Sequence, residues 1–439
     1  MAKNLITLNK LVGLFKEAIA GFPDTRTGKN TGYGMKDFAL AAFSVFFMQS
    51  PSFLAHQRAM KTARGRSNAE TIFGIKKIPC DNQIRSVLDP VSPEYVFPVF
   101  GQAHEWLEES GLIAPLRVLN GQLLIALDGT WYFSSKKIGC LNCSTILNKN
   151  GTTTYYHSAL TPVIVSPGKK MAIPLAPEFI TPQDGGDKQD CETNAGKRWL
   201  DAYGERYGKM GVTILGDDLY SRQPMCEKIL SQGMNFILVS KPDSHKSLYE
   251  WLRVLEEAGD MNSVVVRRWN GKHCEIYTYK YANGAPLRDG EDALSVHWVE
   301  LTITKENGDV LYKNAFVTNH VISDKNVEAI VVAGRTRWKV ENENNNTLKT
   351  KGYNLEHNFG HGEDHLCSLL ATLNILAFLF HTVMDMVGGA YALVRKALSS
   401  RKTFFDHLKA LTCYFCFKNW DHLIEFMIER LELDHPAPG

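Results

Sequence analysis

Three short, predominantly apolar segments constrain the fold of this chain more than any other feature. They are residues 122–127 (QLLIAL), 212–215 (VTIL) and 236–240 (FILVS). Runs of this length without polar alternation are typical of β-strands that are covered on both faces. The chain is therefore predicted to contain an α/β domain whose sheet lies between other layers.

Helical patterns separate the later strands. Residues 194–208 and 223–233 have helical periodicity, and the second of these has a proline near its start and a glycine just past its end. Two further strand-like runs, 152–166 and 171–180, follow the first apolar segment. The predicted order is three strands in an antiparallel meander, then a helix, a strand, a helix and a strand, with a right-handed crossover between the last two strands. This order matches the ribonuclease H-like fold.

The rest of the chain divides by composition. Residues 241–330 hold four β-rich runs separated by Asn-Gly turn signals, which predicts a β-meander inserted into the α/β core. Helical patterns dominate on both sides. The expected organisation is a helical N-terminal region (1–115), the first part of a ribonuclease H-like core (116–240), the β-rich insertion (241–330), the second part of the core (331–395) and a helical C-terminal tail (396–439).

Composition is that of a folded, soluble protein. The 439 residues are 44% hydrophobic and 22% charged, with a net charge of +2, so any surface for nucleic acid must be a local one. Nine cysteines without a secreted spacing pattern favour reduced thiols in a cytoplasm. The most apolar stretch, 366–380, contains Asn374 and is short for a bilayer span, so we expect a core helix and no membrane segment.

A local basic cluster is present near the N-terminus. Residues 53–79 contain six lysines and arginines and one acid. Such a cluster can contact the phosphates of DNA, and it is equally compatible with a solvated helix face. The candidate DNA-binding residues in it are Arg58, Lys61, Arg64 and Arg66.

Two aspartates follow predicted strands. Asp128 comes directly after the first apolar segment, and Asp217 follows the second. Residues after strand ends in an open α/β sheet project into a shared crevice, where ligands bind. An aspartate in this position is also common as a turn residue, so the pair needs a third carboxylate to make a site.

The third carboxylate can come from residues 337–349, which are expected to form one helix. This segment contains two glutamates. At roughly 100° per residue, Glu341 lies on the same side as Trp338 and Val340. Glu343 lies about 200° further round, beside Lys339. Because the apolar side should pack on the sheet, Glu341 is predicted to point towards the strand ends and Glu343 towards solvent.

Three convergent carboxylates suit Mg²⁺, with Mn²⁺ as a substitute, because these hard ions prefer oxygen ligands. Two such ions about 4 Å apart can activate a water or a 3′-hydroxyl and stabilise the leaving oxygen of a phosphodiester. The basic residues near Glu341 would then bind the DNA backbone. These are Arg337, Lys349 and Lys351.

Three sequence blocks carry a family resemblance. ALDGT around Asp128, ILGDDLY around Asp217 and RWKVEN around Glu341 resemble the catalytic blocks of DDE transposases from bacterial insertion sequences. The resemblance is strongest to the cut-and-paste branch, which has a β-rich insertion between the second Asp and the Glu. Segments 81–89 and 352–362 also resemble that family, so the likeness extends over most of the chain.

The resemblance implies a function. Asp128, Asp217 (rather than Asp218) and Glu341 would hold two Mg²⁺ ions, and the reactions would be strand cleavage by water and strand transfer by the freed 3′-hydroxyl. The substrate would be double-stranded DNA, comprising element ends and target, and the N-terminal helices would bind the ends. The natural active form would be a homodimer on DNA, in a bacterial cytoplasm on nucleoid or plasmid DNA.

The family also has a Tyr-Arg-Glu-Lys signature, which this chain matches in part. Arg337 and Glu341 fit it, whereas Gly334 stands at the Tyr position and Leu348 at the Lys position, with Lys349 one residue later. In that family an aromatic residue of the insertion can stack on a flipped base. Trp269 and Trp298 are the candidates here, and either is equally compatible with a place in the core.

Two rival functions remain open. One is a ribonuclease H-like nuclease or resolvase that cleaves without joining, and the other is an inactive, element-derived DNA-binding protein. Zinc is a separate question. His357, His361 and His365 recur at four-residue steps, and two CxxC pairs occur at 140–143 and 413–416, the first of which can also pair with His157.

Overall fold

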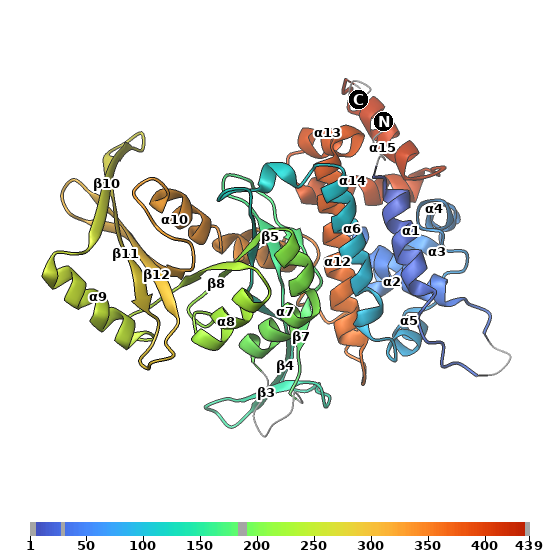
Figure 1. The fold of residues 1–439 in the computed structure, drawn as a ribbon. Helices are drawn as coiled ribbons and strands as arrows, with labels where there is room; N and C mark the ends of the chain where they lie inside the picture. The colour runs from blue at the N-terminus through green and yellow to red at the C-terminus, as the bar shows by residue number, and fades with distance from the viewer. Residues whose placement is uncertain (1–5, 28–30, 183–190, 435–439) are drawn as a thin grey trace.

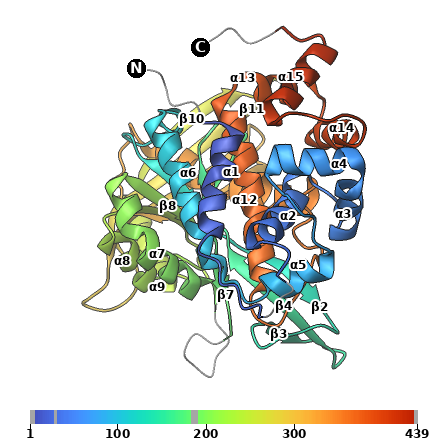
Figure 2. The ribbon, with the colours of Figure 1, turned by 90° about the vertical axis from the view of Figure 1, so that its right-hand side faces the viewer.

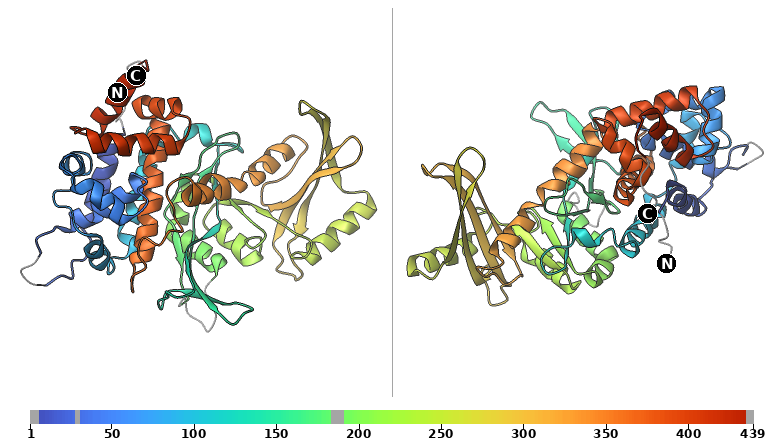
Figure 3. Two further views of the ribbon diagram at one scale, coloured as in Figure 1. Left: turned by 180° about the vertical axis from the view of Figure 1, so that it is seen from behind. Right: turned by 90° about the horizontal axis from the view of Figure 1, so that it is seen from above.

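The computed structural model describes residues 6–27, 31–182 and 191–434. Figure 1 shows three parts in a row: a helical body, a central α/β region and a β-rich unit at the far end. The views from behind and from above keep the helical body and the β-rich unit at opposite ends of the molecule (Figure 3). The protein is thus a mixed α/β structure, as the sequence predicted.

The centre is one nine-stranded mixed sheet with the order β10-β11-β12-β13-β9-β8-β1-β5-β6. The three predicted apolar strands are its parallel middle, because β1 pairs in parallel with β8, and β8 with β9. Beside them β5 and β6 complete an antiparallel meander with β1. The bounds are β1 (Leu123–Ala126), β5 (Val163–Val165), β6 (Ile173–Pro174), β8 (Val212–Gly216) and β9 (Asn235–Val239).

The predicted helices between these strands are confirmed. Helix α7 (Glu192–Lys209) precedes β8, and α8 (Gln223–Ser231) joins β8 to β9. Gly233, just past α8, adopts a left-handed φ of 70°, which a glycine accommodates without strain.

Two of the predicted strands are wrong as single elements. Segments 152–166 and 171–180 are each divided, and the halves belong to different sheets. Pro162 separates β4 from β5, and Pro177 separates β6 from β7; a proline has no N–H to continue a ladder. The second sheet has the order β2-β4-β3, with β7 also paired to β4. Its strands are β2 (Gly129–Ser135), β3 (Ser144–Leu147), β4 (Thr153–Leu160) and β7 (Glu178–Ile180).

The insertion is a β-meander as predicted, with two differences. It opens with a helix, α9 (Lys246–Ala258), that the sequence pattern did not indicate. The Asn-Gly pair at 283–284 lies in a bulge within β11 instead of a hairpin turn. Because β13 pairs with β9, the insertion extends the central sheet. Its strands are β10 (Asn262–Trp269), β11 (Cys274–Pro286), β12 (Ser295–Lys305) and β13 (Val310–Thr318).

Helix α12 (Leu366–Val387) is the centre of the helical body. It is long and apolar enough to cross a membrane, yet 89% of its most apolar window is buried within the protein. It packs along α2 (Met35–Phe47), where Phe43 contacts Phe380 with ring centroids 5.4 Å apart. The predicted core helix is therefore confirmed.

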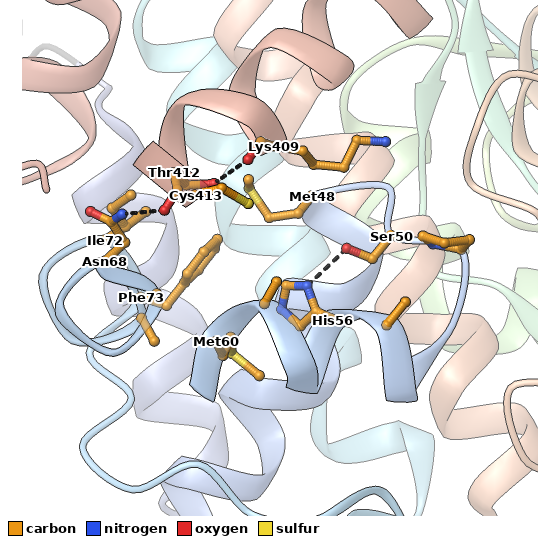
Figure 4. Close-up of a pocket in the computed structure, with 15 residues that line it drawn as sticks. Met48, Ser50, His56, Met60, Asn68, Ile72, Phe73, Lys409, Thr412 and Cys413 are labelled. Carbon is orange, nitrogen blue, oxygen red and sulfur yellow. Dashed lines mark hydrogen bonds between the residues drawn. The ribbon is translucent and has the colours of Figure 1, made fainter. Parts of the chain in front are cut away.

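The N-terminal and C-terminal helices pack around α12 as one body (Figure 2). At the contact drawn in Figure 4, Asn68 donates to the carbonyl of Thr412 at 2.9 Å. Thr71 donates to the carbonyl of Phe417 at 2.7 Å. The helices are α1 (Leu8–Ile19), α3 (Phe53–Lys61), α4 (Ala63–Asn68), α5 (Asp81–Leu88), α6 (Phe97–Glu109), α13 (Gly389–Ala397), α14 (Arg401–Tyr414) and α15 (Trp420–Arg430).

Candidate functional site

Asp128 occupies the junction of the two sheets, between the end of β1 and the start of β2. Its side chain is 19% exposed. Oδ1 lies 3.7 Å from a guanidinium nitrogen of Arg337, and Oδ2 accepts a hydrogen bond from Asn345 at 3.1 Å. The backbone N–H of Thr161 donates to the Asp128 carbonyl at 2.9 Å. The chain crossing from one sheet to the other therefore fixes this residue on both sides.

Asp217 lies at the same edge of the central sheet, because β1 and β8 are parallel neighbours and each ends just before its aspartate. Its Oδ1 accepts the N–H of Leu219 at 2.8 Å. The adjacent Asp218 points elsewhere, since it accepts the N–H of Lys241 at 2.8 Å and the hydroxyl of Ser244. Asp218 thus holds the turn at the start of the insertion, whereas Asp217 is near enough to Asp128 for its charge to raise the pKa of that carboxyl.

Residues 338–350 are helical throughout, as expected for 337–349, but they do not form a regular α-helix. Helix α10 (Val327–Arg335) stops before it, and residues Val340–Asn345 form a π-helix that leads into α11 (Asn346–Thr350). The wider turn changes the phase. Trp338 is exposed, and the buried Lys339 donates to the carbonyls of Ser166 (2.7 Å) and Lys169.

The positions of the two glutamates differ from those expected for a regular α-helix. Glu341 is half exposed, and it reaches the site through Arg337, whose guanidinium donates to Glu341 Oε1 at 2.9 Å while facing Asp128. Glu343 is partly buried on the side of Lys339 instead of pointing fully to solvent. The structure therefore brings Asp128, Asp217 and Glu341 into one neighbourhood, with Arg337 between two of them.

The run of asparagines after Glu343 has a structural explanation. Asn345 is buried and spans the junction: its Nδ2 donates to Asp128, and its Oδ1 accepts from Thr161 at 2.8 Å and from Asn344 at 2.9 Å. This network fixes the carboxylate of Asp128 against the π-helix. Asn345 was not identified from the sequence. The one available signal was a polar amide on the side of the helix that the buried neighbours Asn344 and Leu348 share.

Glu192, at the first turn of α7, is a fourth carboxylate that sequence reasoning missed. Its Oε1 accepts the hydroxyl of buried Tyr220 at 2.8 Å, and its carboxylate accepts a backbone hydrogen bond from Gly129. A Cβ at position 129 would lie 2.3 Å from Glu192 Oε2, so the glycine permits this close approach. The residue is not preceded by a strand, which is why the strand-end pattern did not find it.

The four carboxylates around Asp128 carry more negative charge than the one nearby guanidinium, Arg337, can balance. Burial, and then the charges of Glu192, Glu341 and Asp217, raise the pKa of Asp128 to about 7, although Arg337 opposes the shift. Burial also raises the pKa of Glu192, and Asp217 adds to this. Four carboxylates with one nearby guanidinium form a site that favours an additional cation.

Of the three basic residues predicted to bind DNA near Glu341, two already form ion pairs within the protein. Arg337 is engaged with the carboxylates, and Lys349 forms an ion pair with Glu356 at 2.7 Å. Lys351 is exposed.

The basic cluster lies on α3 and α4, where all four of its candidate residues are exposed: Arg58, Lys61, Arg64 and Arg66. No ion pair within the described residues involves any of them. Beneath these helices is an apolar cavity of about 150 Å³, closed on its far side by α14 (Figure 4). Buried His56 is held there by Ser44 and Ser50, each at 2.8 Å, so it is a core residue.

The two tryptophans of the insertion differ. Trp298 is 4% exposed and packs against Tyr249, so it belongs to the core. Trp269 is 69% exposed at the end of β10 and remains the candidate for stacking. Gly334, at the Tyr position of the family signature, is packed so closely that a Cβ would lie 2.8 Å from Ile237. No larger residue fits there without movement of its neighbours.

A second group of side chains assembles elsewhere. Cys140, Cys143, His157 and His361 have ligand atoms that all lie within 4.8 Å of one another, and in the described part of the chain no other three His, Cys, Asp or Glu residues meet this condition. The carboxylates around Asp128 are thus more widely spaced.

The other zinc candidates from the sequence do not join this group. His357 and His365 are exposed and outside it, and so are Cys413 and Cys416. The four-residue histidine repeat is not on a helix, because the segment from 352 to 365 is irregular. All nine cysteines lie in described segments and are free thiols.

Comparison with protein-family models and with curated proteins gave no match for this chain. Arguments about its function therefore depend on the residues and geometry described above.

Proposed function

We propose that this protein is a metal-dependent DNA transposase that cleaves strands at the ends of a mobile element and joins the freed 3′-hydroxyls to target DNA. The observation that carries the proposal is the carboxylate group around Asp128, in which burial and three like charges raise the pKa of Asp128 to about 7. A divalent cation would relieve that repulsion.

The strand order supports a ribonuclease H-like core for this reaction. In the order β6-β5-β1-β8-β9, an antiparallel meander comes first in the chain and two parallel strands with helical crossovers follow. The sequence blocks that resemble DDE transposases lie at the ends of β1 and β8 and on the π-helix. The inserted β-meander between Asp217 and Glu341 agrees with the cut-and-paste branch.

The donor set fits Mg²⁺ or Mn²⁺, since the four acidic side chains of the group offer oxygen ligands. Asp128, Asp217 and Glu341 would hold the metal, with Glu192 behind Asp128. When bound, two such ions supply activation of a water or 3′-hydroxyl and stabilisation of the leaving oxygen.

The chain's own residues have separate roles in this proposal. Arg337 pairs with Asp128 and Glu341 in the metal-free protein, and it would be free to bind a DNA phosphate if these carboxylates held a metal. Asn345 keeps one oxygen of Asp128 in a fixed direction. The exposed basic residues of α3 and α4 bind the backbone of the element ends. Two ends must be processed together, which favours a homodimer on double-stranded DNA.

The test is cleavage of a duplex that carries the inverted repeats bordering the gene, with Mg²⁺, for the wild type and three variants. Asp128→Asn and Glu341→Gln should lose cleavage and retain DNA binding. Glu343→Gln is the matched control, because this glutamate lies two residues from Glu341 on the other side of the π-helix, and it should cleave like the wild type.

Other outcomes of this test would favour one of the two alternative functions, a nuclease or an inactive DNA-binding protein. Cleavage without joined product, when pre-cut ends and target DNA are supplied, identifies a nuclease or resolvase. Binding of the ends by the wild type without cleavage in either Mg²⁺ or Mn²⁺ overturns the proposal in favour of an inactive DNA-binding protein. Loss of cleavage in Glu343→Gln, with Glu341→Gln active, overturns the assignment of the third ligand.

A further inference from the structure

The cluster of Cys140, Cys143, His157 and His361 lies outside the carboxylate site. Cys140 and Cys143 belong to the loop between β2 and β3, His157 is in β4, and His361 comes from the irregular segment that precedes α12. Three segments of the chain, two of them about 200 residues apart, therefore converge there.

Five of the six distances between the ligand atoms are close to those of a tetrahedral zinc site. The two Sγ atoms are 3.8 Å apart, and the two Nε2 atoms are 3.2 Å apart. Three of the four Sγ–Nε2 distances are 3.6 Å, 3.4 Å and 3.4 Å, and the fourth, from Cys140 to His361, is within 4.8 Å. Zinc bonds of about 2.3 Å to sulfur and about 2.05 Å to nitrogen give tetrahedral edges of about 3.8 Å (S···S), about 3.6 Å (S···N) and about 3.3 Å (N···N).

The surroundings orient both imidazoles. Nδ1 of His361 is 2.8 Å from the carbonyl oxygen of Gly362, so it carries the proton and leaves Nε2 free to bind a metal. The ring of His157 is hydrogen-bonded to the backbone of Asn142. The backbone N–H of Cys140 points at Cys143 Sγ at 3.5 Å and is placed to donate to that sulfur when it binds a metal.

The protein holds His361 in place by contacts of its own. Asp89 accepts the backbone N–H groups of Glu363 (2.9 Å), Asp364 (3.1 Å) and Leu366 (3.1 Å), and so fixes the segment that follows His361. Gly362 adopts a φ of 71°, and a Cβ there would lie 2.2 Å from Asp89. A cavity of about 390 Å³ borders the cluster and gives an ion a path to it.

We propose that Cys140, Cys143, His157 and His361 bind one Zn²⁺ ion in a closed, structural site. Four protein ligands leave no position for substrate, which distinguishes this site from a catalytic zinc centre. Two thiolates and two imidazoles select zinc over Mg²⁺, which prefers oxygen. The ion ties β4 and the loop after β2 to the segment between the π-helix and α12, and so joins the second sheet to the helical body.

Zinc content of the full-length protein, purified with a reductant, tests the proposal. We expect one zinc per chain, and X-ray absorption at the zinc edge should show two sulfur neighbours at about 2.3 Å and two nitrogen neighbours at about 2.0 Å. Replacing zinc by Co²⁺ should give the visible bands of a tetrahedral ion together with thiolate charge-transfer absorption. These measurements use the wild type and do not depend on whether any variant folds.

Variants assign the ligands. Cys143→Ser and His361→Ala should each lower zinc affinity by at least 10-fold to 100-fold, the loss typical even of residues outside the ligand set. Cys413→Ser is the matched control, since it changes a CxxC pair that is exposed and outside the cluster, and it should retain one zinc.

Two results would overturn the proposal. One is a wild-type protein with no zinc after incubation with zinc sulfate and dialysis. The other is a Cys140–Cys143 disulfide that persists in the presence of zinc without reductant, which would identify a redox pair instead. Neither result bears on cleavage by the carboxylate site, so failure of this inference is distinguishable from failure of the proposed function.

Discussion

The carboxylate group around Asp128 and the Cys/His cluster are attached to opposite ends of the same strand, β2, and they differ in how complete they are. In the cluster, five of the six separations between ligand atoms run from 3.2 Å to 3.8 Å, close to the edges of a metal tetrahedron. In the carboxylate group, a guanidinium lies between two of the acids. Neutral imidazoles and thiols can approach one another without a metal, whereas carboxylates repel until a cation arrives.

This difference suggests a division of labour. A closed site that assembles from buried and half-buried groups would stabilise the fold, because its binding energy is also folding energy. An open site whose carboxylates repel one another in the absence of metal keeps its ligands available for a cation that arrives with DNA.

The largest expected difference concerns metal removal. Dialysis against metal-free buffer without a chelator should abolish DNA cleavage, and Mg²⁺ alone should restore it while the zinc content stays at one per chain. The reason is that structural zinc sites bind with about 10–16 kcal/mol, far more than an oxygen site that retains waters. Metal analysis and cleavage on the same samples check this. Restoration that requires zinc as well as Mg²⁺ would break the comparison.

The second prediction concerns pH in the metal-free protein. The pKa of Asp128 rises from 3.8 to about 7 on folding, so this group costs no stability below pH 4 and progressively more as pH rises to 7. The full cost above pH 7 is about 4 kcal/mol. Asp128→Asn should therefore be more stable than the wild type at pH 8 and equal to it at pH 4.

Urea unfolding of both proteins at the two pH values measures the difference. Saturating Mg²⁺ should remove it, because a bound cation favours the ionised carboxylate. A wild type that is as stable as Asp128→Asn at pH 8 without metal would show that Asp128 carries no such penalty.

The contrast also explains what could be predicted from the sequence. Short apolar runs identified β1, β8 and β9, and their ends identified Asp128 and Asp217, because strand burial and strand-end position are local properties. The π-helix was not predictable from a period of 3.6 residues, and with it the exposure of Trp338 and the burial of Lys339 were missed. The pairing of strands in two separate sheets was also not predicted, because Pro162 divides what looks in the sequence like one continuous strand into β4 and β5.

The same limit applies to the Cys/His cluster. The sequence offered Cys140, Cys143 and His157 as one possibility and His361 within a different one. Spacing along the chain cannot join them, because His361 reaches the cluster through contacts of its segment with Asp89. Glu192 was missed for a similar reason: its place depends on the packing of α7 against β2 at Gly129.

The third prediction tests whether Glu192 belongs to the carboxylate group. Glu192→Gln should weaken Mg²⁺ activation of cleavage by about 10-fold to 100-fold, the usual effect of altering a residue that supports metal ligands. Glu205→Gln is the control, because Glu205 lies on the same helix and is exposed. Titration of cleavage rate against Mg²⁺ concentration separates the two. An unchanged Mg²⁺ midpoint in Glu192→Gln would remove Glu192 from the site.

The smallest expected effect belongs to the basic surface of α3 and α4, which lies far from both sites in sequence. Arg64→Gln should reduce the slope of log affinity against log salt by about one, because one phosphate contact and its counterion release are lost. Lys209→Gln, an exposed lysine on α7, should leave the slope unchanged.

Fluorescence anisotropy of an element-end duplex over a range of salt concentrations measures both slopes. Because the contact is with the backbone, the loss in Arg64→Gln should be equal on unrelated duplex DNA. A loss confined to the element ends would instead place Arg64 against base edges, and equal slopes for Arg64→Gln and the wild type would move the DNA away from these helices altogether.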